Sequence, residues 1–507
     1  GHLPMDVADG LVGRSTVATA ERLRLVKVLV DQGWAGIALD HPLYGELRRA
    51  ATSSDRQADL RNRLLDVVEA LDAAAGSRAA GGRAATGAGT GTAIGSTDLA
   101  MVAEWYLLTG RAGPRTAELL LAAAERAWAG NDPQRAAALA RRAWQLHPDD
   151  RAGLLLVSAL ARVGATDELE AVGPVVTREA ATDRVRTLAL MAHALASFQF
   201  ANQPDNARAI LQQGASTVDD PGWRDVLAAE AASYMLQMGG VRAAEAAATP
   251  LLASPNPLAA AGAAAVVGPA QALQGRIADA LATADLGVEL ATSVAEDLPD
   301  TGQYLFHKLV ALVDDGQATV AEALAMAAAA DVPAQASPFD RAFLALSLGR
   351  ILRLRGRPRS AARWFREAAG AFESVQRIGF AAWSFAGLSA VLVDVGDVAG
   401  ARAAADRCRA RNHPIRVGAA EVERSLAWVH VGQGSIEAAA RAFDNAADRG
   451  LDAGELVHAG HALHDLTRLG RAADAVDRLD GLRQDTDSRV VQAYADHAGA
   501  LVAGDLD

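Results

Sequence analysis

A glycine recurs through most of this chain at intervals of 36 to 41 residues, and this period restricts the possible folds more than any other feature. The series consists of Gly164, Gly239, Gly275, Gly316, Gly356, Gly396, Gly434 and Gly470, with Asn202 at one place in the same rhythm. An alanine or leucine follows each of them five residues later, and apolar runs of helical spacing lie between. A period of this length predicts a stack of antiparallel helix pairs, that is, a solenoid.

The residues around these glycines repeat in register. Seven residues before Gly356 stands Gly349, and Ala361, Phe365 and Ala368 follow at fixed offsets. The same offsets around the next glycine but one give Ala427, Ala439, Phe443 and Ala446. Small residues are needed where two helices of a pair cross closely, and the aromatic fills the groove beside them. The pattern resembles the tetratricopeptide repeat without its first-helix tryptophan in most units, so we expect an all-α, TPR-like superhelical solenoid.

The composition agrees with a cytoplasmic helical protein. Aromatic residues make up 5% of the 507 residues, and the net charge is −12. The single cysteine, Cys408, excludes an internal disulfide bond and is compatible with a reducing compartment. No uncharged apolar run approaches the length of about 18 residues that a membrane span needs. We therefore expect a cytoplasmic protein that contacts no membrane and, as this chain alone, binds no nucleic acid.

Three segments differ in their sequence pattern. Residues 1–72 lack the repeat, and the part from 22 to 50 is predicted to run from a helix through a β-prone stretch at 34–39 into another helix. This order is typical of a small winged-helix domain. Residues 73–97 are rich in Gly, Ala and Thr without periodicity, which predicts a flexible linker. Residues 98–507 carry the TPR-like helical repeats.

A family resemblance rests on three segments: HPLYGEL at 41–47, LAMVAEWYLLTGR at 99–111 and ELLLAAAERAWAGNDPQRAAALARRAWQL at 118–146. They are similar to large ATP-binding LuxR-type transcriptional regulators, the MalT-like branch of the signal-transducing ATPases with numerous domains (STAND). In that family an ATPase module precedes the winged helix, a TPR-like superhelix senses an inducer, and a helix-turn-helix follows. The resemblance implies a sensor arm that binds an inducer or an inhibitory partner and controls oligomerisation and transcription activation.

The chain departs from the family at both ends. It contains no GxxxxGK[ST] phosphate loop, so we expect no cofactor in this chain and place ATP in an upstream module of the full-length protein. It also shows no helix-turn-helix after the repeats, so we expect a fragment or a member without its two effector modules. Self-association is expected of the full-length protein, and the inducer could be a sugar, an anionic metabolite or a regulatory protein. The alternative is a TPR-type protein–protein interaction scaffold without a small-molecule ligand.

A histidine, a hydroxyl group and a carboxylate stand close together at His41, Tyr44 and Glu46. No serine or cysteine nucleophile accompanies them, so the motif does not indicate catalysis, and we predict that the chain is not an enzyme. In the family that the chain resembles, the winged helix packs against the ATPase. The resemblance therefore implies that these three residues relay the nucleotide state between domains.

The repeat register predicts which side chains line the concave surface. Aromatic rings beside arginine, glutamine and aspartate are typical of a site for a sugar or a planar metabolite. Such residues occur before the turn glycines, at positions that the register assigns to the first helix of each pair. The predicted ligand-binding set is Gln199, Phe200, Gln237, Phe306, Phe343, Arg350, Arg353, Trp383, Asp394, Arg424 and Trp428.

Two further motifs leave alternatives open. Residues 350–366 contain seven arginines and no acid, which indicates either a site for an anionic ligand or acidic partner, or a solvated surface balanced by neighbouring repeats. His458, His461 and His464 recur at a spacing of three, so a shared metal is geometrically conceivable. No carboxylate or thiol completes that set, and we favour partly exposed helix histidines without a metal.

Overall fold

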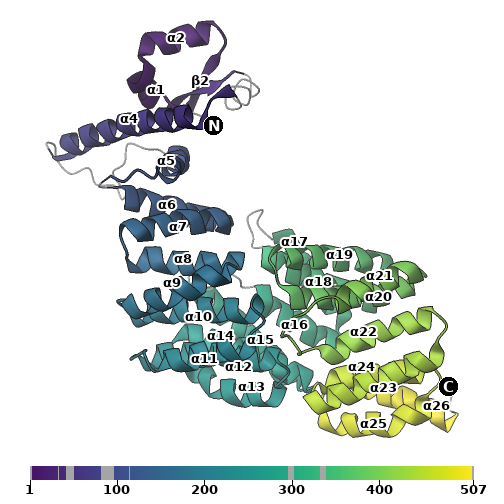
Figure 1. Cartoon of the computed structure of the whole chain (residues 1–507). Helices are drawn as coiled ribbons and strands as arrows, with labels where there is room; N and C mark the ends of the chain where they lie inside the picture. The colour runs from purple at the N-terminus through teal and green to yellow at the C-terminus, as the bar shows by residue number, and fades with distance from the viewer. Residues whose placement is uncertain are drawn as a thin grey trace. The chain divides into compact units, whose positions relative to one another are not determined.

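The computed structural model describes residues 3–31, 34–40, 51–80, 96–113, 115–294, 302–331 and 338–504. It divides into two compact units, Gly1–Ala159 and Leu160–Asp507, which are described separately below (Figure 1). Helices dominate both units, and the strands that are described lie in the first 39 residues. The expectation of an all-α repeat protein that begins with a small mixed domain is confirmed.

The first unit begins with a three-stranded sheet in the order β1-β3-β2 and continues into helical pairs. Its elements are β1 (Leu3–Pro4), α1 (Met5–Val12), α2 (Arg14–Arg22), β2 (Val26–Asp31), β3 (Trp34–Leu39), α4 (Ser54–Ala80), α5 (Ser96–Thr109), α6 (Thr116–Ala129), α7 (Pro133–Leu146) and α8 (Asp150–Val163), the last of which crosses the boundary between the units. Helices α1 and α2 precede the antiparallel strand pair β2–β3, and the assignment of residues 1–72 as a winged helix stays a prediction.

One part of that prediction was wrong. The segment before the β-prone stretch was expected to be helical, but Val26–Asp31 forms strand β2, in which Val28 pairs with Ile37 of β3. Three valines alternate with other residues in β2, and β-branched side chains favour the pleated conformation over the helix. Helix α4 packs closely against α1, since a Cβ at Gly10 of α1 would stand 2.6 Å from the Val67 side chain.

Helix α4 extends into the range that was predicted as a linker. It continues to Ala80, because alanine and arginine around 73–80 are good helix formers. The next helix, α5, begins at Ser96. Tyr106 of α5 donates a hydrogen bond of 2.9 Å to Glu69 of α4, and Arg111 forms ion pairs with Glu69 and Asp66 at 2.7 and 2.6 Å. Most of the predicted linker, residues 81–95, lies outside the described residues, and the domain boundaries at 72 and 97 stay predictions.

The second unit is a succession of helix pairs after α9. Its elements are α9 (Thr166–Glu179), α10 (Asp183–Gln199), α11 (Pro204–Ala215), α12 (Pro221–Gln237), α13 (Val241–Ala248), η1 (Thr249–Ala253), α14 (Pro257–Leu273), α15 (Ile277–Ser293), α16 (Gly302–Asp314), α17 (Ala318–Asp331), α18 (Pro338–Leu354), α19 (Pro358–Ser374), α20 (Ile378–Asp394), α21 (Val398–Arg409), α22 (Ala419–Gly432), α23 (Ile436–Ala453), α24 (Leu456–Arg468), α25 (Ala472–Asp485) and α26 (Arg489–Ala503). We call α17, α19, α21, α23 and α25, the second helices of their pairs, the outer helices.

The turn glycines behave as the period predicted. All eight have φ between 69° and 89°, and Asn202 has φ 54°. This left-handed conformation costs glycine little, and asparagine adopts it more readily than most residues do. Asn131 and Gln376 have φ 56° at turns between helices that the glycine pattern did not mark. The repeat therefore depends on the conformation of this position more than on glycine itself.

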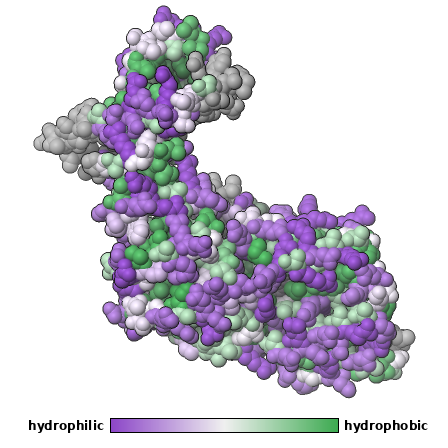
Figure 2. All heavy atoms as spheres, in the orientation of Figure 1, coloured by the Kyte–Doolittle hydropathy of each residue, from purple (hydrophilic) through white to green (hydrophobic). Residues whose placement is uncertain are grey.

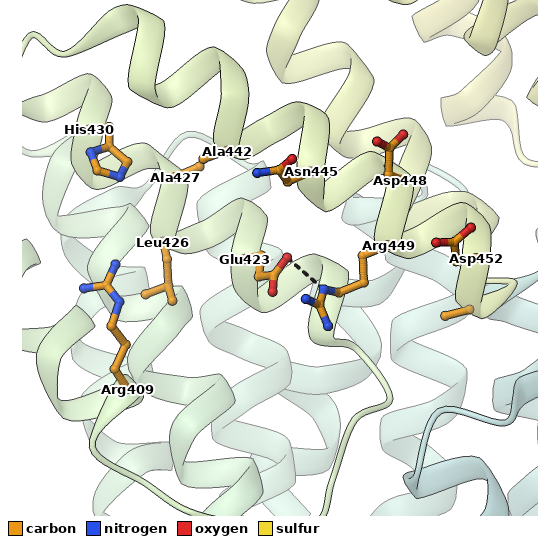
Figure 3. Close-up of a pocket in the computed structure, with 11 residues that line it drawn as sticks. Arg409, Glu423, Leu426, Ala427, His430, Ala442, Asn445, Asp448, Arg449 and Asp452 are labelled. Carbon is orange, nitrogen blue, oxygen red and sulfur yellow. Dashed lines mark ion pairs between the residues drawn. The ribbon is translucent and has the colours of Figure 1, made fainter.

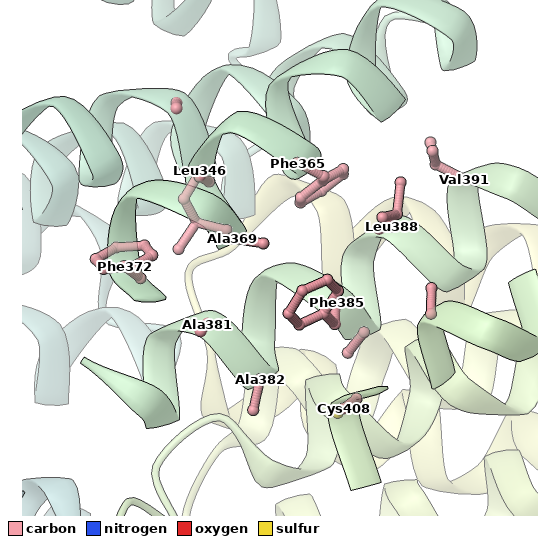
Figure 4. Close-up of a cluster of buried hydrophobic side chains, with 14 of the residues drawn as sticks. Leu346, Phe365, Ala369, Phe372, Ala381, Ala382, Phe385, Leu388, Val391 and Cys408 are labelled. Carbon is pink, nitrogen blue, oxygen red and sulfur yellow. The ribbon is translucent and has the colours of Figure 1, made fainter. Parts of the chain in front are cut away.

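The small positions of the register lie where helices cross closely. Ala361, Ala368 and Ala427 are fully buried, and a Cβ at Gly349 of α18 would stand 2.9 Å from the Phe365 ring of α19. Phe365 fills the space beside α18 and α20 in a large apolar cluster (Figure 4). Close helix contact at small residues thus leaves a defined hole that the aromatic side chain fills.

Two segments of the second unit fold back onto much earlier repeats. The segment 410–418, between α21 and α22, places Ile415 in the apolar cluster of α10 and α12, and the backbone N–H of Arg416 donates to the carbonyl oxygen of Gln237 at 2.6 Å. The segment 486–488, before α26, reaches α15, where Asp487 accepts a 2.6 Å hydrogen bond from the backbone N–H of Ile277. We call these contacts the closure of the superhelix.

The closure continues at the end of α16. Arg489 forms an ion pair with Asp315 at 2.6 Å, and the Ser488 hydroxyl donates to the carbonyl oxygen of Asp314 at 2.8 Å. These partners are 174 residues apart in the chain. Helix α24 also contacts α14, and Nε2 of His461 on α24 lies 3.7 Å from Asp314 at the end of α16. In the part of the chain that the structure describes, no helix is both long enough and apolar enough to span a membrane.

Candidate functional site

Two phenylalanines that we predicted on the inner face belong to the hydrophobic core instead. Phe306 of α16 and Phe343 of α18 are 5% and 3% exposed, and their ring centroids lie 4.7 Å apart. Phe372 of α19 packs against Phe343 at 5.2 Å. The prediction was wrong here because α18 is buried on nearly every side, so its sequence has no polar stripe that marks an open face.

Arg350 and Trp383 lie together, and Arg350 pairs with an acid of the same chain. A guanidinium nitrogen of Arg350 lies 3.4 Å from a carboxylate oxygen of Asp314, and the guanidinium stands 5.5 Å above the Trp383 ring. Asp314 is fully buried. Burial alone would raise its pKa, but a hydrogen bond from His461 and the charge of Arg350 hold that pKa below its ordinary value.

Arg424 and Trp428 also lie together, in a second buried group of charges. Arg424 binds Glu421 through two contacts of 2.8 Å and reaches Asp465 of α24 at 2.8 Å. The indole N–H of Trp428 donates to the same Asp465 at 3.0 Å. This tryptophan is 7% exposed and therefore does not line an open groove. Burial would raise the pKa of Glu421, but the charge of Arg424 and its hydrogen bonds lower it far below its ordinary value.

The remaining predicted residues form two separate pairs. Arg353 of α18 binds Asp394 of α20 at 2.9 Å, and its guanidinium lies 5.9 Å from the Trp428 ring. Gln199 and Gln237 are hydrogen-bonded at 3.3 Å on α10 and α12. Phe200 is half-buried beside the turn at Gly164, where its ring would contact an added Cβ at 3.1 Å. The structure therefore brings together the arginines and indoles of α18 to α22, whereas the residues of α10 and α12 lie apart from them.

The three histidines of α24 have different partners. His458 is 1% exposed with Nδ1 2.9 Å from Glu455, His461 Nδ1 lies 3.1 Å from the Tyr494 hydroxyl, and His464 stacks on the Tyr494 ring at 3.8 Å. The interpretation of partly exposed histidines was thus wrong for His458. Its burial is caused by the closure, which places α24 against α14 and the end of α16. No group of three potential ligands among the described residues could hold a metal ion.

His458 stands at the centre of the buried charges. Burial alone would lower its pKa, but the hydrogen bond and charge of Glu455 and the charges of Glu421 and Asp314 raise the pKa above its ordinary value. Glu455 in turn accepts a 2.7 Å hydrogen bond from the backbone N–H of Gly418, the residue immediately before α22. We call this set, with Arg350, Arg424 and Asp465, the inner charge network.

Sequence reasoning missed the acidic half of this network. Asp314, Glu421, Glu455 and Asp465 are all buried. Asp314 pairs with Arg350, and Glu421 and Asp465 pair with Arg424, both of which we had assigned to a ligand, whereas Glu455 binds His458. A signal was present, because each of these acids interrupts or borders an otherwise apolar first helix. Which arginine each acid would meet depended on the closure, and no local pattern contains that information. His41, Tyr44 and Glu46, the predicted relay, lie outside the described residues.

The arginine-rich segment 350–366 is largely balanced by neighbouring repeats. Arg350 and Arg353 have the inner partners given above, and Arg355 and Arg357 both bind Glu322 of α17. Arg355 and Arg357 therefore follow the solvated, balanced interpretation, whereas Arg350 and Arg353 are balanced by acids but largely buried. Arg359, Arg363 and Arg366 are exposed on α19 and have no ion pair in the described structure.

A groove of about 1000 Å³ lies over α22, between the end of α21 and α23 (Figure 3). Leu426 and Ala427 of α22 and Ala442 of α23 form its apolar part. The fold explains its position, because the segment 410–418 turns away from α21 to reach α12 before α22 begins.

The two ends of this groove differ in the charge of their residues. Arg409, which also forms an ion pair with Asp406 at 3.5 Å, and the imidazole of His430 lie at one end, and Asp448 and Asp452 lie at the other (Figure 3). Between them, Glu423 and Arg449 neutralise each other at 2.9 Å. Asp448 also forms an ion pair with Arg478 of α25 at 2.5 Å, whereas the exposed Asp452 has no ion pair in the described structure. A groove with an apolar base and charges of opposite sign at its ends is suited to an elongated, dipolar ligand.

Comparison with known proteins identifies no family. No protein-family model matches the chain, and no curated protein matches it. Among solved structures it is similar to a Rap protein complexed with Competence and Sporulation Factor, with 16% identity and a TM-score of 0.46, over 70% of this chain and 98% of that one. It is also similar to the Cut9–Hcn1 hetero-tetramer of the APC/C, with 14% identity, a TM-score of 0.40 and coverage of 80% and 81%. Yeast Tom70 gives 10% identity, a TM-score of 0.32 and coverage of 77% and 96%.

These similarities are too distant to indicate a ligand or an activity. The resemblance to MalT-like regulators accordingly depends on the sequence segments between 39 and 145 alone. The TPR-like repeat fold, by contrast, is evident from the helix pairs and their turn conformations.

Proposed function

We propose that this protein is a non-catalytic protein-interaction scaffold that binds one α-helix of a partner protein in the groove between α21 and α23. The observation that carries the proposal is the opposite charge at the two ends of that groove (Figure 3). An α-helix has a partial positive charge at its N-terminus and a partial negative charge at its C-terminus. The bound helix would therefore direct its N-terminus toward Asp448 and Asp452 and its C-terminus toward Arg409 and His430.

The base of the groove supports this occupant. Ala442 is small, which allows a helix backbone to approach closely, and Leu426 offers an apolar contact. Helix-in-groove recognition uses such a strip with apolar anchors at helical spacing on the ligand. The inner side of the superhelix offers less, because its arginines and its buried tryptophan already bind acids of this chain.

Filling the groove tests the proposal. Ala442→Trp places a large ring in the groove, whereas Ala473→Trp adds the same ring at an exposed position of α25. Proteins crosslinked to the wild-type chain in its native cells would be identified by mass spectrometry and compared between the two variants. We expect Ala442→Trp to lose the partners that crosslink at α22 and α23, and Ala473→Trp to retain them. Equal partner sets for both variants would contradict binding in this groove.

A second candidate is the sensor arm of a MalT-like regulator, which the sequence resemblance favours. One oxygen of Asp314, one guanidinium nitrogen of Arg350 and Nε2 of His458 are buried without a hydrogen-bond partner in the described structure. An anionic metabolite that reaches the inner charge network would compete with Asp314 for Arg350. Under this proposal, a metabolite that raises the melting temperature of the wild type would not do so for Arg350→Ala or Trp383→Ala. Unchanged shifts in both variants would argue against an inner site.

A further inference from the structure

Six arginines on or beside the outer helices share one pairing pattern. Each of these six binds an acid on the preceding outer helix, between 30 and 38 residues earlier in the chain. The pairs are Arg355 and Arg357 with Glu322, Arg407 and Arg411 with Glu373, Arg471 with Glu437, and Arg478 with Asp444 and Asp448. The outer surface of these repeats is therefore charged but locally neutral.

Helix α19 departs from this pattern. Arg359, Arg363 and Arg366 are exposed at spacings of four and three, so they lie on one face of the helix. None of them forms an ion pair in the described structure, and Glu367, the nearest acid in the helix, is not paired with them either. Single unpaired arginines occur on α21 and α23, but among the described outer helices only α19 gathers three on one face. We call this set the arginine face.

The arginine face is partly ordered by an aromatic ring. The guanidinium of Arg363 lies 5.5 Å from the ring centroid of Trp364, and Trp364 packs against two of the apolar clusters. A guanidinium over an aromatic ring keeps its charge and its outward N–H groups while it loses some of its freedom. Such an arginine pays less conformational entropy when it binds a carboxylate.

The neighbouring outer helix offers apolar surface instead of charge. Val320 and Met326 of α17 are 53% and 51% exposed. Glu322 is the one charged residue from 318 to 330, and it is already bound by Arg355 and Arg357. These ion pairs, and the hydrogen bond of Arg355 to Thr319, connect α17 directly to the start of α19, and the two helices lie side by side in Figure 1.

We propose that α17 and the arginine face of α19 together bind an acidic amphipathic helix of a partner protein. Arg359 and Arg366 are about 10 Å apart along the helix axis, which is two turns, so carboxylates at matching spacings on one face of the partner can meet all three arginines. Apolar residues on its adjoining face would cover Val320 and Met326. Figure 2 shows hydrophilic and hydrophobic residues interspersed on the face of the molecule that it presents.

The chemistry favours a protein over a nucleic acid as the occupant. Exposed apolar side chains beside the arginines contribute to binding a protein helix but not a phosphate backbone. The chain as a whole has a net charge of −12, which repels a polyanion beyond these three residues. This surface involves other helices than the groove of Figure 3, so each can fail without the other.

The test measures binding of a fluorescein-labelled peptide to the purified full chain by anisotropy. The peptide has about 18 residues, with glutamates on one helical face and leucines on the adjoining face, and a scrambled peptide has the same composition. Arg359→Gln, Arg363→Gln and Arg366→Gln are combined in one variant. The matched control combines Arg224→Gln, Arg242→Gln and Arg441→Gln, which removes three exposed arginines elsewhere. Circular dichroism verifies that both variants keep their helical content.

We expect the arginine-face variant to bind the peptide about tenfold more weakly, and the control variant to bind it like the wild type. Met326→Glu should also weaken binding, because it places an acid against the acidic ligand. Equal binding of the scrambled peptide, an equal loss in both triple variants, or tighter binding of a single-stranded RNA of similar charge would each overturn the proposal.

Discussion

At the scale of single residues, the buried histidine of α24 shows how the closure determines charge. His458 is surrounded by Glu455, immediately before its own helix, Glu421 of α22 and Asp314 of α16. Arg424 binds Glu421, and Arg350 binds Asp314. A neutral imidazole would leave these buried acids with less compensating positive charge. The elevated pKa of His458 is therefore a consequence of contacts between repeats that are distant in the sequence.

This arrangement predicts a pH dependence of stability. Because the folded-state pKa of His458 is raised above the unfolded value of about 6.5, its stabilising contribution is complete below that pH and is lost as pH rises through the folded pKa. His458→Gln should lower the urea midpoint strongly near pH 6 and progressively less at higher pH. Urea unfolding of both proteins across this range, followed by circular dichroism, measures the difference. A pH-independent difference would show that His458 is not charged in the folded protein.

At the scale of helices and turns, the left-handed turn position is what the sequence specifies most clearly. Gly356 has φ 69°, and an added Cβ there would meet no atom within 4 Å. Any cost of substitution is therefore due to backbone strain and not to crowding. Gly370 lies within α19, where a Cβ would also meet nothing, but its φ is that of a helix. The two glycines thus separate the effect of conformation from that of packing.

We predict opposite effects of the same substitution at these two positions. Gly356→Ala should destabilise the protein by about 1 kcal/mol, because alanine is strained at positive φ. Gly370→Ala should stabilise it by about 0.5 to 1 kcal/mol, because alanine is a better helix former than glycine. Thermal unfolding of both variants measures the two shifts. A gain in stability for Gly356→Ala would contradict the conformational explanation of the repeat.

Also at this scale, the helix pairs could be predicted from the sequence, whereas the open face could not. The spacing of Gly349, Gly356 and Phe365 depends on contacts within one hairpin, so it is visible in a short window. The exposure of Phe343 and Trp428 depends on which other repeats cover them. Strand β2 was missed because a short apolar run does not by itself distinguish a strand from a helix.

At the scale of the whole second unit, the closure decides which surfaces are available to a partner. Asp487 accepts hydrogen bonds from the backbone N–H groups of Ile277 and Ala278, at 2.6 and 3.2 Å, and its own N–H donates to Gly275. Its carboxylate therefore caps α15 from a position more than 200 residues later in the chain. A sequence pattern cannot indicate this partner, because capping residues are normally found next to the helix that they cap.

The closure is tested most directly by hydrogen exchange at the start of α15. In the closed superhelix the amides of Ile277 and Ala278 are protected by Asp487. We predict that Asp487→Ala increases their exchange about five- to thirtyfold, since loss of such a cap costs about 1 to 2 kcal/mol, while the first turn of α21, capped locally by Asp397, exchanges as before. Unchanged protection of Ile277 and Ala278 in Asp487→Ala would show that the superhelix is open in solution and that its inner face is accessible to a ligand.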